Sequence, residues 1–190
     1  MNKNIRQIAL AALVAMLSVS AARAADQELS KDTQQAIADF KRVDSTLGTF
    51  FDKSSGYAVF PNVGKGGFIV GGARGKGLVY ATNAVIGEAT MTQASIGAQA
   101  GGQSFAEVIF FETPSALDDF KSGKFEMSAE VSAVAAAEGA SQAAKYKNGV
   151  AVFTLPKKGL MAQASIGGQK FKFEPETPTP TGRPTEKKEN

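Results

Sequence analysis

From Gly56 onward the chain consists of short apolar runs separated by glycine, a pattern that restricts it to mostly β-structure. The runs are rich in the branched and aromatic residues that favour strands. They lie at residues 57–60, 68–70, 78–80, 89–99, 108–111, 150–155 and 171–173. Apolar and polar side chains also alternate over 125–132 and 160–166, and this period of two predicts strands. The alanine-rich residues 133–144 leave helix and strand both open.

Residues 26–51 are expected to form an amphipathic helix. Apolar side chains recur there at steps of three and four residues, and charged side chains fill the other face. Ser30 is the expected N-cap, and Gly48 the expected stop. Because the polar face mixes Asp with Lys, packing on the domain's own sheet is favoured over lying on a membrane.

A second, short helix is expected near residues 114–122. Pro114 suits its first position and Gly123 lies just past its end. Leu117 and Phe120 would then point inward. Together these patterns predict a single α+β domain, dominated by a curved antiparallel sheet, with an amphipathic helix at its N-terminus.

The first 24 residues have the layout of a secretory signal peptide. Lys3 and Arg6 form a basic start, residues 8–19 are mainly apolar, and Ala22-Arg23-Ala24 supplies a small-x-small cleavage site. This apolar run is shorter than the roughly 20 residues that span a bilayer. We therefore expect removal after Ala24 and export to the periplasm or cell envelope.

The other end of the chain, residues 174–190, is dominated by Pro, Thr and charged residues. Such a segment buries too little apolar surface to offset the entropy of ordering, which predicts a disordered tail. The folded domain would then occupy residues 25–173.

Charge and composition exclude several classes of function. The formal charge of +3 comes from 21 basic and 18 acidic residues, and the three basic residues of the signal peptide would leave 18 of each sign. A neutral mature chain has no overall field to attract nucleic acid, so we expect no such partner. The chain also lacks cysteine and histidine, which excludes disulfides, Cys/His zinc sites and histidine-based catalysis.

Four acidic side chains are candidates for acid–base catalysis, but their positions do not suggest an active site. They are either adjacent on the expected short helix or alternate with core residues on an expected strand, so solvent exposure explains them. The side chains in question are Asp118, Asp119, Glu126 and Glu130. We therefore expect a protein that is not an enzyme and uses no cofactor or metal.

Basic residues among glycines form the candidate binding motif. Lys65, Arg74 and Lys76 lie within the glycine-rich residues 64–77, which match neither common nucleotide-binding motif. Glycine lets backbone amides approach an anion, and a basic side chain adds charge-assisted hydrogen bonds. The alternative, which composition alone favours, is that the glycines serve tight turns and the lysines keep strand ends soluble. Lys157 and Lys158 form a second basic turn, and the sequence does not show whether the two meet.

The run from Tyr57 to Gly77 resembles the signature of the SYLF domain family. The similarity continues at residues 96–102, 110–117, 122–125 and 158–167, and covers about residues 29–173. The resemblance implies binding of phosphoinositides and other anionic lipids, and in eukaryotic members links to actin. Residues 85–92 replace the family's usual tryptophan-containing segment.

For an exported bacterial-type chain, the resemblance points to a general anionic phospholipid as the partner. The expected head-group contacts are Lys65, Arg74, Lys76, Lys157 and Lys158, with Phe68 against acyl chains. The alternative is a module that binds a protein partner in the cell envelope.

Overall fold

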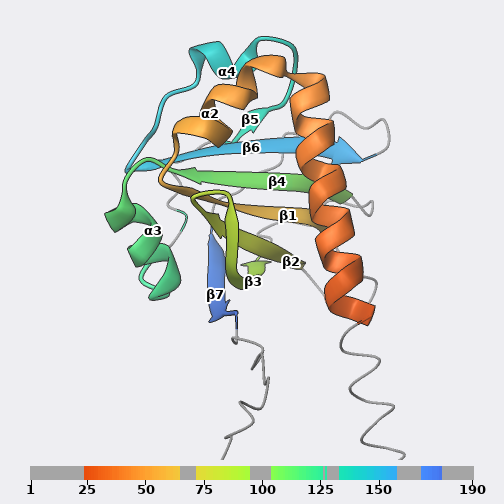
Figure 1. Ribbon diagram of the computed structural model, residues 1–190, viewed down its shortest axis with the longest axis vertical. Coiled ribbons are helices and arrows are strands. Elements are labelled where there is room, and N and C mark those ends of the chain that lie inside the picture. Colours follow the sequence, from red (N-terminus) through yellow and green to blue (C-terminus); the bar gives the residue numbers. More distant parts are fainter. Residues whose placement is uncertain are drawn as a thin grey trace, which may run out of the picture.

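The computed structural model describes residues 24–64, 72–94, 104–125, 127, 133–157 and 168–176. In this part of the chain, seven strands form one open sheet in the order β5-β6-β4-β1-β2-β3-β7 (Figure 1). The strands are β1 (Gly56–Gly64), β2 (Gly72–Ala81), β3 (Ala84–Ala94), β4 (Ser104–Phe111), β5 (Val134–Ala135), β6 (Val150–Lys157) and β7 (Gln169–Pro175). All neighbours pair antiparallel except β5 and β6, which are parallel. The predicted α+β class with a mainly antiparallel sheet is confirmed.

The sheet is strongly twisted, and each of its faces carries its own core. In Figure 1, β4 and β6 run across the view while β7 runs almost vertically. On the face that we call the helix face, the first helix (residues 24–43) and α2 (Gly48–Lys53) pack over Tyr57, Phe110 and Phe153. On the opposite face, called here the α3 face, α3 (Pro114–Lys121) covers a core that includes Phe111 and Phe171.

The N-terminal segment differs from its prediction at three points. Ser30 lies inside the first helix and is not its N-cap. The helix ends before Asp44, whose backbone is extended (φ −140°, ψ 98°), so a single helix to residue 51 is wrong. Gly48 begins α2 instead of stopping a helix. The break arises because the Asp44 side chain accepts a hydrogen bond from the Thr46 amide and so caps the 3₁₀ turn η1 (Ser45–Leu47).

The predicted short helix is confirmed in detail. Pro114 occupies the first turn of α3, and the Thr113 hydroxyl accepts a hydrogen bond from the Ala116 amide. Leu117 and Phe120 are buried, as expected. Gly123 follows the helix with a φ of 70°, a left-handed conformation that glycine adopts without strain.

Most of the predicted strand runs lie within strands, with shifted ends. Residues 57–60, 78–80, 108–111 and 150–155 lie inside β1, β2, β4 and β6. The run predicted at 89–99 begins earlier, because the positive φ values of Thr82 and Asn83 form a two-residue turn that starts β3 at Ala84. Residues 95–99, 68–70 and 160–166 lie outside the described residues.

The strand predicted at residues 125–132 is wrong where the structure describes it. Phe125 and Met127 are in irregular chain, and the other residues from 126 to 132 lie outside the description. Met127 exchanges only two backbone hydrogen bonds with the start of β7, through Gln169 and Gly168, at 3.3 and 3.2 Å. The ambiguous residues 133–144 contain both β5 and the short helix α4 (Ala140–Ala143).

The ends of the chain lie largely outside the description. Residues 1–23, which hold most of the expected signal peptide, and residues 177–190 of the expected tail are not described. β7 continues past Phe173 to Pro175, and the Glu176 amide donates to the Ile86 carbonyl at 3.0 Å. The helices of the described part lack the length and apolar character needed to cross a bilayer.

Candidate functional site

Three exposed basic residues lie in one row across the sheet. Strand pairing aligns one residue from each of six neighbouring strands in this row: Lys157 (β6), Ser104 (β4), Gly64 (β1), Arg74 (β2), Thr92 (β3) and Lys170 (β7). Directly paired residues share a face of the sheet. Neighbouring strands are about 4.8 Å apart, so Arg74 lies about 14 Å from Lys157 and about 10 Å from Lys170 along the row.

A second basic row lies beside the first. Lys76 is two residues from Arg74 on β2 and pairs with Asn62 on β1 and Thr90 on β3, which in turn pairs with Lys172 on β7. Arg74 and Lys76 alternate with core residues of the α3 face, so both rows lie on the helix face. We call the five residues Arg74, Lys76, Lys157, Lys170 and Lys172 the basic surface.

Lys157 is held against the sheet by a polar chain that reaches the first helix. Its ammonium donates to the Asn62 side-chain oxygen. The Asn62 amide nitrogen in turn donates to a carboxylate oxygen of Asp32 at 2.8 Å. Asn62 is paired with Lys76 in the strand register. Its hydrogen bond therefore holds Lys157 on the same side of the sheet as Lys76.

Counter-charges balance only part of the basic surface. Lys76 lies 3.8 Å from the Glu88 carboxylate, and Lys172 lies 2.7 Å from the Glu174 carboxylate. Lys172 and its hydrogen bond, together with Lys76, hold the pKa of Glu174 below its usual value. Among the described residues, Arg74 has no ion-pair or hydrogen-bond partner. Exposed pairs of this kind contribute little to stability, so these cations can exchange partners.

Gly77 has a structural role within β2 and does not lie in a turn. A Cβ at Gly77 would lie 2.3 Å from the Val59 carbonyl oxygen and 2.7 Å from the Phe60 ring. The β1–β2 pairing is irregular between Val59 and Asn62, which brings the two backbones close there. The close approach, and not a ligand, accounts for this glycine.

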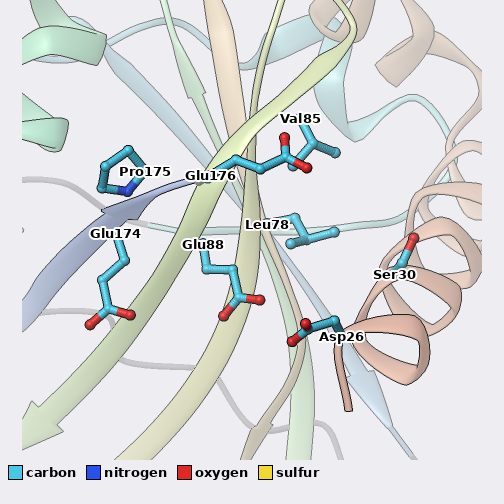
Figure 2. Close-up of a pocket in the computed structure, with 9 residues that line it drawn as sticks. Asp26, Ser30, Leu78, Val85, Glu88, Glu174, Pro175 and Glu176 are labelled. Atoms are coloured by element: carbon cyan, nitrogen blue, oxygen red, sulfur yellow. The ribbon is translucent and has the colours of Figure 1, made fainter. Parts of the chain in front are cut away.

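Figure 2 shows an acidic cleft on the helix face, which adjoins the second basic row through the pairs of Lys76 with Glu88 and of Lys172 with Glu174. The cleft has a volume of about 450 Å³ and lies between the start of the first helix and strands β2, β3 and β7. Four carboxylates line it: Asp26, Glu88, Glu174 and Glu176. The helix face thus carries two basic rows and, directly beside the second of them, the carboxylates of the cleft.

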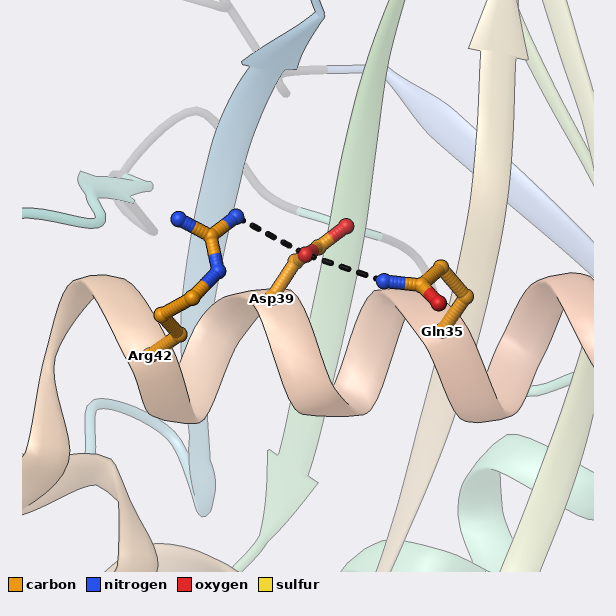
Figure 3. A network of polar contacts seen from close by, with 3 residues as sticks. All are labelled: Gln35, Asp39 and Arg42. Carbon is orange, nitrogen blue, oxygen red and sulfur yellow. Dashed lines mark hydrogen bonds and ion pairs between the residues drawn. The ribbon is translucent and has the colours of Figure 1, made fainter.

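The exposed side of the first helix carries its own polar network (Figure 3). Asp39 accepts a hydrogen bond from Arg42 at 2.9 Å and one from Gln35 at 3.1 Å. The Arg42 bond is the main reason that the pKa of Asp39 lies below its ordinary value, and the charge of Lys157 lowers it further. Arg42 is therefore already paired, and Lys157 lies close enough to the helix to act on its charges.

The structure tests only part of the predicted site. It places Arg74, Lys76 and Lys157 on one surface, whereas Lys65, Phe68 and Lys158 lie outside the described residues. Lys170 and Lys172 were not predicted. The alternation of Lys with Phe in residues 169–173 marks them as sharing one face of a strand, but strand pairing is needed to align them with Arg74.

The acidic residues considered for catalysis do not form an active site where they are described. Asp118 and Asp119 are exposed on α3, and Asp118 pairs with Lys121 at 2.7 Å. Glu126 and Glu130 lie outside the described residues. Within the described ranges, no group of three or more acidic side chains is arranged to hold a metal ion.

Comparison with known proteins places this domain in a class of binding modules. Residues 92–177 match the Ysc84 family model, described as "Las17-binding protein actin regulator". Over 124 residues the chain is 36% identical to the "Beta cell expansion factor A" of Aeromonas veronii. That alignment covers 64% of this chain and 46% of the relative, so the chain spans about half of the relative's length.

These matches confirm the resemblance to the SYLF (Ysc84) family that the sequence shows, with the family model matching residues 92–177. The family is generally one of binding modules, as its description as a binding protein indicates. The matched residues 92–177 include β4, β6 and β7, and with them Lys157, Lys170 and Lys172 of the basic surface.

Proposed function

We propose that this SYLF domain is an exported, non-enzymatic module that binds anionic phospholipids on an envelope membrane. The observation that carries the proposal is the alignment of Lys157, Arg74 and Lys170 in one exposed row. Each basic residue near an anionic membrane contributes about 1 kcal/mol. Five such residues would give weak, reversible binding that salt weakens.

The extent of the surface supports a multivalent anion. The five cations extend over strands β6 to β7, about 24 Å along the curled sheet at the usual strand spacing. A single small anion contacts only one or two of these positions, whereas a membrane presents phosphates to several of them. Lys65, Lys158 and Phe68 remain part of the proposal as further head-group and acyl-chain contacts.

The test is co-sedimentation of residues 25–190 with vesicles that contain anionic or only neutral phospholipid, at low and high salt. We expect binding to the anionic vesicles alone, weakened by salt. Arg74→Glu, Lys157→Glu and Lys170→Glu should each weaken binding about tenfold or more, because each removes one attraction and adds one repulsion.

The matched control is Lys145→Glu, which makes the same charge change at an exposed residue before the start of β6, away from Lys157 at its end. This variant should bind as the unchanged protein does. If all four variants lose binding equally, the basic surface is not the binding site. If no vesicle is bound under any condition, the lipid proposal fails.

The second candidate function is binding of a protein partner in the cell envelope. The family description names a Las17-binding protein, which favours a protein ligand for at least that member. A protein-binding role predicts indifference to lipid composition together with specific, saturable capture of one envelope protein.

A further inference from the structure

One contact joins two strands that are far apart in the sheet order. Glu107 lies in the middle of β4 and Gln169 begins β7, with β1, β2 and β3 between the two strands. Gln169 Nε2 nevertheless donates to Glu107 Oε2 at 2.9 Å, and both residues are fully buried. The contact is possible because the sheet curls around the α3 face, where both strands place core residues. The Glu107–Gln169 pair therefore joins β7 to β4 across the curled sheet.

Each member of this pair has one oxygen without a partner. Among the described residues, Glu107 Oε1 and Gln169 Oε1 are buried and accept no hydrogen bond. An ionised carboxylate with one hydrogen bond in an apolar core is costly. A single proton on Glu107 removes the charge and makes the carboxyl group a donor. A hydrogen bond from that proton to Gln169 Oε1 would satisfy both unpaired oxygens and complete a ring of two hydrogen bonds.

We propose that Glu107 and Gln169 form a neutral carboxylic acid–amide pair that holds β7 over the α3 face, and that loss of the proton at rising pH releases β7. In the ionised form, Glu107 has no proton to donate to the amide oxygen, and both oxygens stay without a partner. Because β7 is the last strand in the sheet order, it can separate without disrupting the other pairings. This inference does not depend on lipid binding.

The surroundings of Glu107 support a neutral side chain. Its neighbours in strand pairing are Phe60 on β1 and Thr154 on β6, and the ring of Phe171 on β7 contacts Phe60. Burial raises the pKa of Glu107 to about 7, and the hydrogen bond from Gln169 opposes the rise only in part. Among the described residues, no charged group on these packed elements contributes to the shift.

The direction of the pH effect follows from this raised pKa. The folded protein retains a proton that an unfolded glutamate, with its usual pKa of 4.5, releases. The stability contributed by the pair is therefore complete at or below pH 4.5 and is lost as the pH rises through about 7. Because the chain has no histidine or cysteine, few other groups titrate between pH 5.5 and 9.

The test compares the protein with Glu107→Gln in urea unfolding and in hydrogen exchange of the β7 amides, from pH 5 to pH 9. Glutamine at this position can donate to Gln169 Oε1 and accept from Nε2 at every pH. The unchanged protein should show an increase in the opening constant of β7 on the order of a hundredfold over this range, beyond the intrinsic change in exchange rate. Glu107→Gln should show none.

Glu138→Gln is the matched control, because it makes the same charge change at an exposed turn and should retain the full pH dependence. Parallel pH profiles for the unchanged protein and Glu107→Gln would overturn the proposal. The carbon-13 NMR signal of the Glu107 carboxyl, assigned by its loss in Glu107→Gln, tests the unchanged protein directly. A carboxylate signal at pH 6 would also overturn the proposal.

Discussion

Asp44 shows how one side chain decides the course of the N-terminal segment. It is fully buried, and its carboxylate accepts hydrogen bonds from the Thr46 amide at 3.0 Å and from the Ser141 amide at 2.8 Å. The second bond joins residues 97 positions apart, and so ties the end of the first helix to the start of α4. Burial alone would raise the pKa of Asp44, but the bonds from Thr46 and Ser141 outweigh it and the pKa is lowered.

Replacement of Asp44 by Ala should therefore be among the costly changes in the protein. It removes a cap and leaves the Ser141 amide without its partner, which should lower the free energy of unfolding by about 2–4 kcal/mol in urea titrations. The stability from Asp44 is present above its usual pKa of 3.8 and is lost as the pH falls through the lowered folded value. The stability contributed by Glu107 changes in the opposite direction, because it is lost as the pH rises.

Asp52→Ala is the control for Asp44, since Asp52 is exposed in α2. It should change the unfolding free energy by less than about 0.5 kcal/mol. Asp44→Asn retains acceptor atoms but no charge, and should lie between the two. Equal stability of Asp44→Ala and Asp52→Ala would show that the bond to α4 adds nothing to folding.

At the scale of elements, the close approach of β1 and β2 leaves no room for a side chain at Gly77. Gly77→Ala would place a Cβ 2.3 Å from the Val59 carbonyl oxygen, an atom of the backbone that cannot rotate away. We expect a loss of about 2–3 kcal/mol in the free energy of unfolding, because the two strands must separate at their irregular pairing.

Gly48→Ala is the informative comparison, because a Cβ there meets nothing within 4 Å and the backbone is already helical. Alanine should raise the unfolding free energy by about 0.5–1 kcal/mol. Equal effects of the two glycine substitutions would mean that backbone proximity at Gly77 does not limit the pairing of β1 with β2.

Short-range sequence patterns predicted the elements that depend only on residues close together in the chain. Alternation and residue type located the strands, and Pro114 with Gly123 located α3. The break at Asp44 depends in part on Ser141, which no pattern near residue 44 reveals. Residues 125–132 alternate like a strand, yet Phe125 and Met127, the two of them that the structure describes, are in irregular chain.

For the candidate site too, the sequence identified some of the residues but not how strand pairing aligns them. The sequence located Arg74 and Lys76 in a glycine-rich segment read as turns, and only their place in β2 puts them on one face of a strand. Their alignment with Lys157 and Lys170 depends on pairings across six strands, so sequence spacing alone does not give it.

At the scale of the whole molecule, successive rows of the sheet on the helix face change from basic to acidic residues. The row of Lys157, Arg74 and Lys170 is followed by the row of Lys76 and Lys172. The next row pairs Leu78 with Glu88 and Glu88 with Glu174, beside the acidic cleft. A molecule with this distribution should orient itself at an anionic surface even where its overall charge is near zero.

A double charge swap separates this orientation from the effect of overall charge. Arg74→Glu combined with Glu176→Lys leaves the net charge unchanged, because one substitution removes two units of positive charge and the other restores them at the acidic cleft. If the basic rows bind the membrane, the double variant should bind anionic vesicles as weakly as Arg74→Glu alone, since the restored charge lies at the acidic cleft and not in the row of Arg74. Glu176→Lys alone should bind at least as well as the unchanged protein. Full recovery of binding in the double variant would instead show that overall charge governs attraction, and that the alignment of Arg74 with Lys157 and Lys170 has no part in it.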